Sequence, residues 1–563
     1  MSERGIDRRT DPRRGVVLRI GLALTATGVV SAAIDRRALA GVTADVRLAV
    51  GFGLFLGLLL FASFRRPPGW MTWVALLSVA LVYLAAAAEL ASSMLGMTSY
   101  ILLALGATIV TAPHLRPLMV GTFALWTPAL WVFGPTAALD QLPALLRVAA
   151  VVALAFTVIA IADPRKTHPS DRLRHAGYGI LAVAVVSASI GRSNVVASIG
   201  YAPGEVGAIV CSFLLPILSF VPLPRARREL LVTGLALLTF SFTGLAYILG
   251  TAYQADVVAA EHRAAELVIA GQNPYATFDL PEALDRFHMD PELATHTLDG
   301  GVVHTYNYPP MSFLPLVPYV LFGFADIRWV FLVEVLLIAV IAASQLRPSW
   351  RAPAIATVIG SEIVTRQWIL AGVDPAWALY TLLAWLARDR RIISSVLLGL
   401  AIADRQPAWF VAPFFLLAIL ERYGRREAMR TAAIAGATAL AILAPFLIGN
   451  FYRTMGGLLT PIFAPLVSAG VGLVRYGFED YGPLFPRDVY TVLSIGAVFG
   501  LLILLWRRPR SLAGAPLVWP FLPLYLAWRS GQNYFAAAPL FALVADDELA
   551  DAPLDTEATP KAT

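Results

Sequence analysis

Long apolar stretches recur along the whole chain, and most approach the length that a helix needs to cross a membrane. A straight helix requires roughly 20 apolar residues to span the hydrocarbon, and the segments 46–64, 431–449 and 488–506 are of this kind. The chain is 58% hydrophobic and 14% charged, with a mean hydropathy of +0.71, which is too apolar for a soluble domain. The sequence therefore predicts an all-α polytopic membrane protein with about 18–20 membrane segments. Shorter or weaker segments included in that number are 311–324, 457–474, 514–528 and 532–545.

The positive charge of the chain predicts its topology. The net charge is +6, and Lys166 and Lys561 are the only lysines, so arginine carries almost all of the surplus. Positive residues remain on the cytoplasmic side of membrane proteins, and the surplus therefore gives no reason to expect nucleic acid as a partner. We expect both termini in the cytoplasm and the polar loop 251–310 outside. The clusters assigned to the cytoplasm lie at 65–66, 165–174, 225–228, 388–391, 422–426 and 507–510.

The same rule places residues 404–407, 450–487 and 529–533 outside, together with the polar loop. The two halves of the chain agree on this topology only if 311–371 contains an odd or re-entrant piece. The segment 352–371 is not expected to cross as one straight helix, because polar groups at that depth need protein or water around them. The residues that interrupt it are Gly360, Glu362, Arg366 and Gln367.

The loop 251–310 concentrates the titratable groups of the chain. It holds nine acidic residues and only two arginines, and it contains four of the seven histidines: His262, His288, His296 and His304. None of them shows the H-E-x-x-H or H-x-x-E-H spacing of a metal site, so structural or solvated histidines are expected and neither a metal nor another cofactor is predicted. The loop is either a solvated connection between spans or the place where chemistry occurs.

The start of this loop has helical composition. Residues 256–271 end at Gly271, a plausible helix stop, and their apolar and polar positions alternate at helical spacing, which suggests an interfacial helix. Asn273-Pro274 would then turn the chain. Tyr308-Pro309-Pro310 similarly holds an extended approach to the next apolar segment.

These features together resemble the GT-C membrane glycosyltransferases, in particular the branch with actinobacterial α-mannosyltransferases that use polyprenyl-phosphate sugars. The resemblance rests on Asp256 after a span, a short helix, Gly271-x-Asn273-Pro274-Tyr275 and Tyr306-x-Tyr308-Pro309-Pro310. Gly399-Leu400-Ala401 followed by Arg405-Gln406-Pro407 is also similar, with arginine where the family often has lysine. Ala260 stands where the family often has a tyrosine. The likeness covers roughly residues 230–545.

The resemblance implies a GT-C-like helical core with an outer catalytic loop. It implies inverting transfer of a sugar, such as mannose, from a polyprenyl-phosphate donor to a cell-envelope glycan or glycolipid outside the membrane. Asp256 would be the general base, with Glu261 as the runner-up. A departing phosphate needs cations, which Arg405 or Arg529 could supply; Arg405 could instead pair with Asp404, and Arg529 could extend to the interface. Predicted substrate contacts are Asn273, Tyr275, His304, Tyr306, Tyr308, Arg405, Gln406 and Arg529.

The chain would then consist of an N-terminal multi-span region of unknown role (1–228), the GT-C-like core (229–545) and a disordered cytoplasmic tail (546–563). A transporter or flippase of lipid-linked saccharides is the main alternative, because Glu334 lies in an apolar run and intramembrane charges are functional by default. Glu362 and Arg366 could simply pair at i and i+4. A non-catalytic scaffold for envelope assembly is the third hypothesis. The single cysteine, Cys211, excludes an internal disulfide.

Overall fold

The computed structural model describes residues 223–345, 365–470, 485–507 and 515–537, together with isolated positions near these ranges. The expected N-terminal spans with their arginine clusters, Gly360 and Glu362 of the interrupted segment, and the tail 546–563 lie outside the described residues. The described part is mostly helical, as expected for an all-α membrane protein. Three of its helices are long and apolar enough to cross a membrane: Thr233–Gly250, Arg425–Gly449 and Arg487–Arg507.

The helices follow one another with short connections. The longer ones are α9 (Arg225–Gly250), α10 (Asp256–Ile269), α14 (Arg328–Gln345), α17 (Ala376–Leu386), α18 (Arg391–Ile402), α19 (Pro407–Tyr423), α20 (Arg425–Gly449), α21 (Phe451–Phe463) and α22 (Arg487–Arg507). Short turns of helix are α11 (Pro274–Thr277), α12 (Leu280–Arg286), η3 (Pro291–Leu293), η4 (Pro310–Ser312), α13 (Leu316–Leu321), η5 (Thr365–Leu370), α23 (Ala515–Val518), α24 (Phe521–Leu526) and α25 (Gln532–Phe535). Two-residue strands β1 (Ala469–Gly470) and β4 (Arg529–Ser530) pair in parallel, and β2 (Gly477–Phe478) pairs with β3 (Gly482–Pro483) antiparallel.

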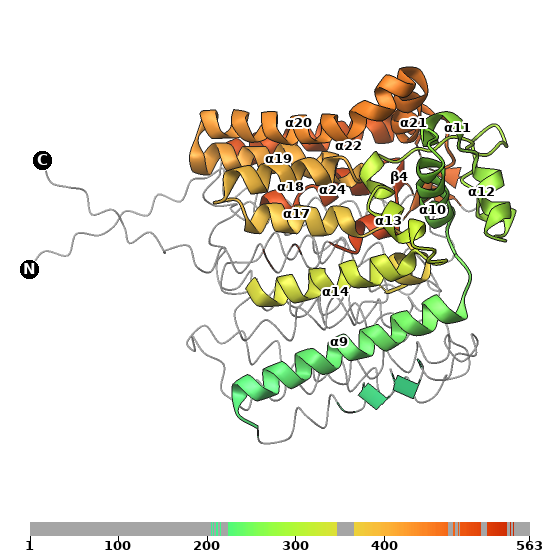
Figure 1. Cartoon of the computed structure of the whole chain (residues 1–563). Coiled ribbons are helices and arrows are strands. Elements are labelled where there is room, and N and C mark those ends of the chain that lie inside the picture. The colour runs from blue at the N-terminus through green and yellow to red at the C-terminus, as the bar shows by residue number, and fades with distance from the viewer. Residues whose placement is uncertain are drawn as a thin grey trace, which may run out of the picture.

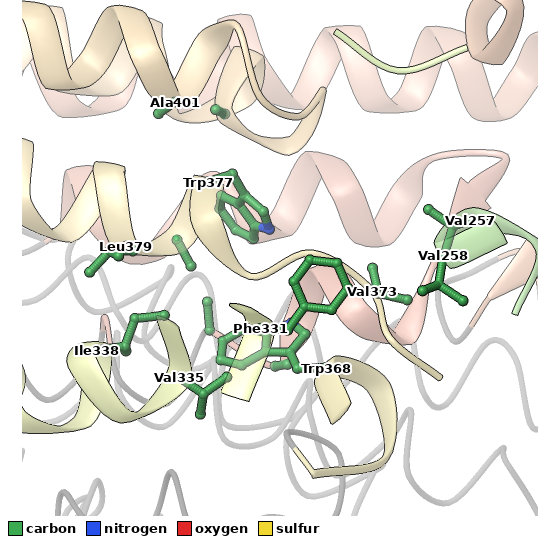
Figure 2. Packing of buried hydrophobic residues seen from close by; sticks show 14 of the residues in the cluster. Val257, Val258, Phe331, Val335, Ile338, Trp368, Val373, Trp377, Leu379 and Ala401 are labelled. Atoms are coloured by element: carbon green, nitrogen blue, oxygen red, sulfur yellow. The ribbon is translucent and has the colours of Figure 1, made fainter. Parts of the chain in front are cut away.

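The long helices run side by side, and the short elements gather at one end of them (Figure 1). Helices α9, α14, α17–α20 and α22 form the bundle, whereas α10–α13, α21 and β4 lie together at the end that we call the loop end. Aromatic and branched side chains fill the space between the bundle helices. Figure 2 shows Phe331 and Val335 of α14 next to Trp368 of η5, with Trp377 of α17 lying over them. This packing gives the loop end a rigid floor.

One close helix contact depends on a glycine of the sequence motif. A Cβ atom added to Gly399 of α18 would lie 2.6 Å from the backbone oxygen of Ala435 in α20. Such a distance is too short for a carbon–oxygen contact, so only glycine lets the two helices approach this closely. Gly399 therefore serves helix packing.

The apolar segment 311–324 does not form the span that its composition predicts. It contains η4 and the six-residue α13, and Gly323 turns the chain in a left-handed conformation with a φ of 83°. Six residues cannot cross a hydrocarbon layer that requires roughly 20. The chain thus leaves α9, stays at the loop end through 251–327 and enters the bundle again at α14 (Figure 1). The arginine topology needs an odd piece of this kind within 311–371, and that topology stays a prediction.

The other weak spans are also broken within the described residues. Helix α21 ends at Phe463 and is followed by β1, while 514–528 contains only the short helices α23 and α24. The described end of 352–371 is a π-helical turn, η5, after which Gly372 adopts a φ of 69°. A positive φ lies outside the right-handed helical region, so the helix ends there, and glycine adopts this φ without strain. Most of the segment lies outside the described residues, so its interruption stays a prediction.

Segments that the sequence assigns to one side of the membrane lie together at the loop end. The backbone nitrogen of Met311 donates to the Ala403 oxygen at 2.8 Å, and Gln406 Nε2 donates to the Asn307 oxygen at 2.7 Å. Trp528 Nε1 donates to the Leu466 oxygen at 2.7 Å. These bonds join residues around 310, 403, 466 and 528. Which side of the membrane they face stays a prediction.

We predict that the loop end faces outward and that the α19–α20 turn faces the cytoplasm. In a Cys211→Ser background, single cysteines at the exposed positions Ala276 and Glu421 report the two ends of the bundle. An impermeant thiol reagent applied to intact cells is expected to label Ala276→Cys and to leave Glu421→Cys unlabelled until the cells are lysed. The reverse pattern would invert the topology.

Candidate functional site

The site is built around Asp256, the first residue of α10. Helix α9 ends at Gly250, and five extended residues bring the chain to α10 at the loop end. A carboxylate in the first turn of a helix is favoured by the helix dipole, which suits Asp256 to this position. Its Oδ2 accepts a hydrogen bond of 2.5 Å from Thr295 Oγ1. The carboxylate is thus held from two parts of the loop.

The surroundings of Asp256 shift its acidity. Burial raises the pKa of its carboxyl above the ordinary value, and this effect exceeds the opposing influence of the Thr295 hydroxyl and of Arg529. A carboxylate with a raised pKa accepts a proton more readily. Asp256 therefore has the electrostatic character of a base, held by one hydroxyl and faced by one cation.

Tyr308 and Tyr534 lie in the same electrostatic environment as Asp256 and Arg529. Burial holds the pKa of Tyr308 well above its usual value, the negative charge of Asp256 raises it further, and the positive charge of Arg529 lowers it. The Tyr308 hydroxyl therefore stays protonated and can donate a hydrogen bond. We call these four residues, Asp256, Tyr308, Arg529 and Tyr534, the loop-end site.

Arg529 reaches this site from the distant C-terminal part of the chain. It lies in β4, whose pairing with β1 fixes its backbone. Its side chain is partly exposed, and its Nη1 donates to the Val467 oxygen at 3.5 Å. No ion pair of Arg529 occurs within the described part of the chain. Most of its five donors therefore remain available for an anion.

Arg405, the other arginine singled out by the sequence, is in a different situation. Its side chain is 3% exposed and forms an ion pair with Glu261, and its Nε lies 3.8 Å from Asp374 Oδ2. The guanidinium also stacks over the ring of Tyr308, 4.3 Å from the ring centroid. The ion pair is thus with Glu261, and not the Asp404 pair considered from the sequence. Arg405 supports Tyr308 from beneath.

Glu261 lies five residues after Asp256 on the same helix. Residues five apart on a regular helix differ in direction by about 140°, so the two carboxylates face different sides of α10. Glu261 is 0% exposed and faces Arg405. A group locked in a buried ion pair is poorly placed to receive a proton from a substrate.

The sequence did not single out Asp374. It follows Gly372-Val373 and precedes Pro375, and its Oδ1 accepts from the Ala376 nitrogen at 2.7 Å, which caps α17. Its carboxyl lies close enough to that of Asp404 for the two to influence each other's ionisation. Glu334 of α14 lies close enough for its charge to affect Asp374 and Asp404. The signal that could have revealed Asp374 is its place in the short polar break between two apolar segments.

The tyrosines of the sequence motifs are mostly structural. Tyr275 is buried and donates to the Tyr308 oxygen at 2.6 Å, and Tyr306 is buried with its hydroxyl 2.6 Å from Ser312 Oγ. Asn273 caps α11 by accepting from the Tyr275 nitrogen, and its Nδ2 donates to the Phe446 oxygen at 3.2 Å. These contacts hold the loop in its fold and position the backbone of Tyr308. Gln406 Nε2 donates to the Asn307 oxygen and so holds the residue next to Tyr308.

The expected interfacial helix at 256–271 is half right. The structure confirms a helix, α10, and Gly271 follows it with a φ of 72°. The polar side that such a helix would turn to water is absent, because Glu261 and His262 are buried along with the apolar residues. Protein partners on both sides replace water: Glu261 meets Arg405, and His262 Nδ1 lies 3.0 Å from the Tyr253 hydroxyl. Helix α10 is therefore enclosed.

The histidines do not assemble a metal site. His262 stacks on Phe287 at 4.6 Å between ring centroids, and burial lowers its pKa. His304 is exposed and its Nδ1 lies 2.6 Å from Asp279 Oδ1, outside the loop-end site. Among the described residues no group of three or more histidine, cysteine or acidic side chains could hold a metal ion.

Comparison with known proteins adds no relative. No family model, curated protein or solved structure matches the chain.

Proposed function

We propose that the chain is a GT-C-type glycosyltransferase that moves a sugar from a polyprenyl-phosphate donor to a glycan or glycolipid outside the membrane. Mannose is the sugar that the resemblance suggests. The observation that carries the proposal is the loop-end site, where a carboxyl with a raised pKa accepts a hydrogen bond from Thr295 and lies within electrostatic range of a partly exposed arginine and a tyrosine. These groups stand at one end of helices long enough to cross a membrane, where a lipid phosphate would lie.

The chemistry needs one base and one anion site. An acceptor hydroxyl attacks the anomeric carbon of the donor, and its proton passes to Asp256. The bond between the anomeric carbon and the phosphate oxygen breaks, and its electron pair leaves on the phosphate. A positioned carboxylate typically contributes a factor of about 10²–10⁴ in rate as a general base. Attack opposite to the leaving group inverts the anomeric centre.

Arg529 and Tyr308 would stabilise the departing phosphate. Arginine presents a planar fork that matches phosphate oxygens, and the Tyr308 hydroxyl can add a further donor. Arg405 is assigned to the support of Tyr308, because its guanidinium is already engaged by Glu261. We therefore assign Arg529 to the contact with substrate and Arg405 to the positioning of Tyr308.

The transporter hypothesis retains one specific observation in its favour. Glu334, Asp374 and Asp404 place three carboxyl groups together at the inner side of the loop end, and Asp404 is 0% exposed. Buried carboxyls in membrane proteins often mark proton or ion pathways. In this hypothesis the donor would cross the membrane unchanged.

One experiment separates the two functions. Purified protein is reconstituted into sealed vesicles with radiolabelled polyprenyl-phosphate sugars and lipid acceptors, and both labelled product and donor moved to the opposite leaflet are measured. We expect transfer of label to the acceptor. Translocation of intact donor without transfer would instead identify a transporter.

The Arg529→Gln variant is expected to lower transfer by about 10²-fold, the usual effect of losing one group that stabilises transition-state charge. Arg529→Lys should recover part of that loss, since it restores the charge without the fork. Arg286→Gln is the matched control, because Arg286 is an exposed loop arginine paired with Glu266. Equal activities for Arg529→Gln and Arg286→Gln would remove Arg529 from the site.

A further inference from the structure

Helix α20 presents most of its surface to its surroundings. It is a 25-residue apolar helix, and only 6% of its apolar window is buried inside the protein. A helix that is hydrophobic on its outer face faces lipid in a membrane protein. The single residue Asn450 separates it from α21, and its side-chain oxygen caps the new helix at the Arg453 nitrogen. Helix α21 therefore begins directly after a helix that is long and apolar enough to cross a membrane.

Helix α21 has two contrasting faces. The face with Thr454, Gly457 and Leu458 is buried against the rest of the loop end. The opposite side carries Tyr452, which is 86% exposed, and Phe463, which is 73% exposed. Large aromatic side chains that gather on one side of a helix mark a surface that contacts a membrane or another molecule. Other exposed apolar residues at or beside α21 are Ile448, Phe451 and Ile462.

The buried face of α21 lies directly on the loop segment 306–308, which leads to the loop-end site. A Cβ atom added to Gly457 would be 2.3 Å from the Tyr306 backbone oxygen and 3.1 Å from the Tyr275 ring. Tyr275 in turn donates to the oxygen of Tyr308. Helix α21 therefore packs against the residues that contact the backbone of Tyr308.

We propose that α21 lies in the interfacial plane of the bilayer, with its aromatic face among the lipids and Arg453 bound to a phospholipid phosphate. Aromatic residues gather at the membrane interface because their rings are amphipathic or fit the acyl boundary. Arg453 is exposed, and the described residues give it no ion pair. Its charge complements the phosphate of a headgroup. This inference does not depend on the glycosyltransferase proposal.

Continuity with α20 favours lipid over a second copy of the chain as the occupant of this face. The exposed residues begin with Ile448 in the last turn of α20, which is 87% exposed, and pass without interruption into α21. A surface that is continuous with a lipid-facing helix is expected to contact lipid as well. The buried face of α21 touches the loop that carries Tyr308. An α21 held at the membrane surface would therefore fix the distance of the loop-end site from the bilayer.

Depth-dependent quenching tests the proposal. Tyr452→Cys in a Cys211→Ser background is labelled with an environment-sensitive fluorophore and placed in vesicles of phosphatidylcholine and phosphatidylglycerol. We expect a blue-shifted emission that lipids spin-labelled near the headgroup quench more than lipids labelled at the chain end. Gln272→Cys, exposed at the same end of the bundle, is the control and should respond to aqueous iodide only.

Two results would overturn the proposal. If the Tyr452→Cys label were as accessible to iodide as the Gln272→Cys label, α21 would face water. If lipid quenchers had no effect on a label shielded from iodide, and the unlabelled Tyr452→Cys protein formed a disulfide between two chains, the occupant would be a second copy. For the phosphate contact, Arg453→Glu should reduce the lipid quenching of the Tyr452→Cys label in phosphatidylglycerol vesicles. Unchanged quenching would remove Arg453 from the contact.

Discussion

Replacement of Asp256 by asparagine is expected to lower glycosyl transfer by a factor of about 10²–10⁴, the usual contribution of a general base. The amide keeps the size of the side chain and can still accept the hydrogen bond of Thr295, but it cannot take a proton at neutral pH. Initial rates with a labelled polyprenyl-phosphate sugar measure the loss. The protein level should stay normal, because the folded geometry is retained.

The pH dependence of the native enzyme follows from the same group. Burial raises the pKa of Asp256, so the base becomes protonated at a higher pH than an exposed aspartate would. We expect kcat/KM to fall as the pH falls through that raised pKa. A raised pKa also means that the ionised carboxylate costs stability above the ordinary aspartate pKa. Asp256→Asn should therefore be at least as stable as the native protein at neutral pH.

Matched carboxylates in the same loop provide the control. Glu282 is exposed and pairs with Arg263, and Asp290 is exposed and caps η3. Glu282→Gln and Asp290→Asn should leave transfer close to the native rate. If Asp256→Asn retained activity within a few-fold and Glu261→Gln lost it while remaining folded, the base would be Glu261. If neither substitution mattered, the glycosyltransferase proposal would fail.

The sequence predicts the features of this protein that local rules determine. Apolar length identifies the helices α9, α20 and α22, and helical composition with a glycine stop identifies α10. The arginine clusters group the segments that the structure joins at the loop end. Such features depend on residues close together in the chain, where length, charge and turn chemistry act.

Partners distant in sequence could not be predicted in the same way. The polar side of α10 reads as a solvent-facing surface until Arg405, over 140 residues later, is found against Glu261. Arg405 and Arg529 are equal candidates in the sequence, and the structure distinguishes them by burial and by the ion pair of Arg405 with Glu261. The sequence gives no reason to single out Asp374, because an aspartate before a proline is an ordinary helix cap. The structure shows that Asp374 also has this role at the start of α17. Tertiary contacts decide the role of each of these charges.

The second large effect concerns the buried pair of Glu261 and Arg405. Removal of one partner of a buried ion pair leaves the other charge without compensation, which typically costs about 3–5 kcal/mol. Glu261→Gln should therefore destabilise the protein strongly. Arg405→Met should destabilise it more, because Glu261 and Asp374 would both lose their cation. Unfolding of the purified protein in mild detergent by denaturant measures both changes.

A double-mutant cycle distinguishes the ion pair from two independent defects. In Glu261→Gln/Arg405→Met neither charge of the pair remains, so the combined loss should be well below the sum of the single losses. The folded fraction of Glu261→Gln should still transfer sugar, since its base is intact, whereas Arg405→Met should transfer more slowly because Tyr308 loses the guanidinium beneath its ring. Additive losses in the cycle would show that the two side chains do not act as a pair. Native-like stability of Glu261→Gln would mean that Glu261 is not charged in the folded protein.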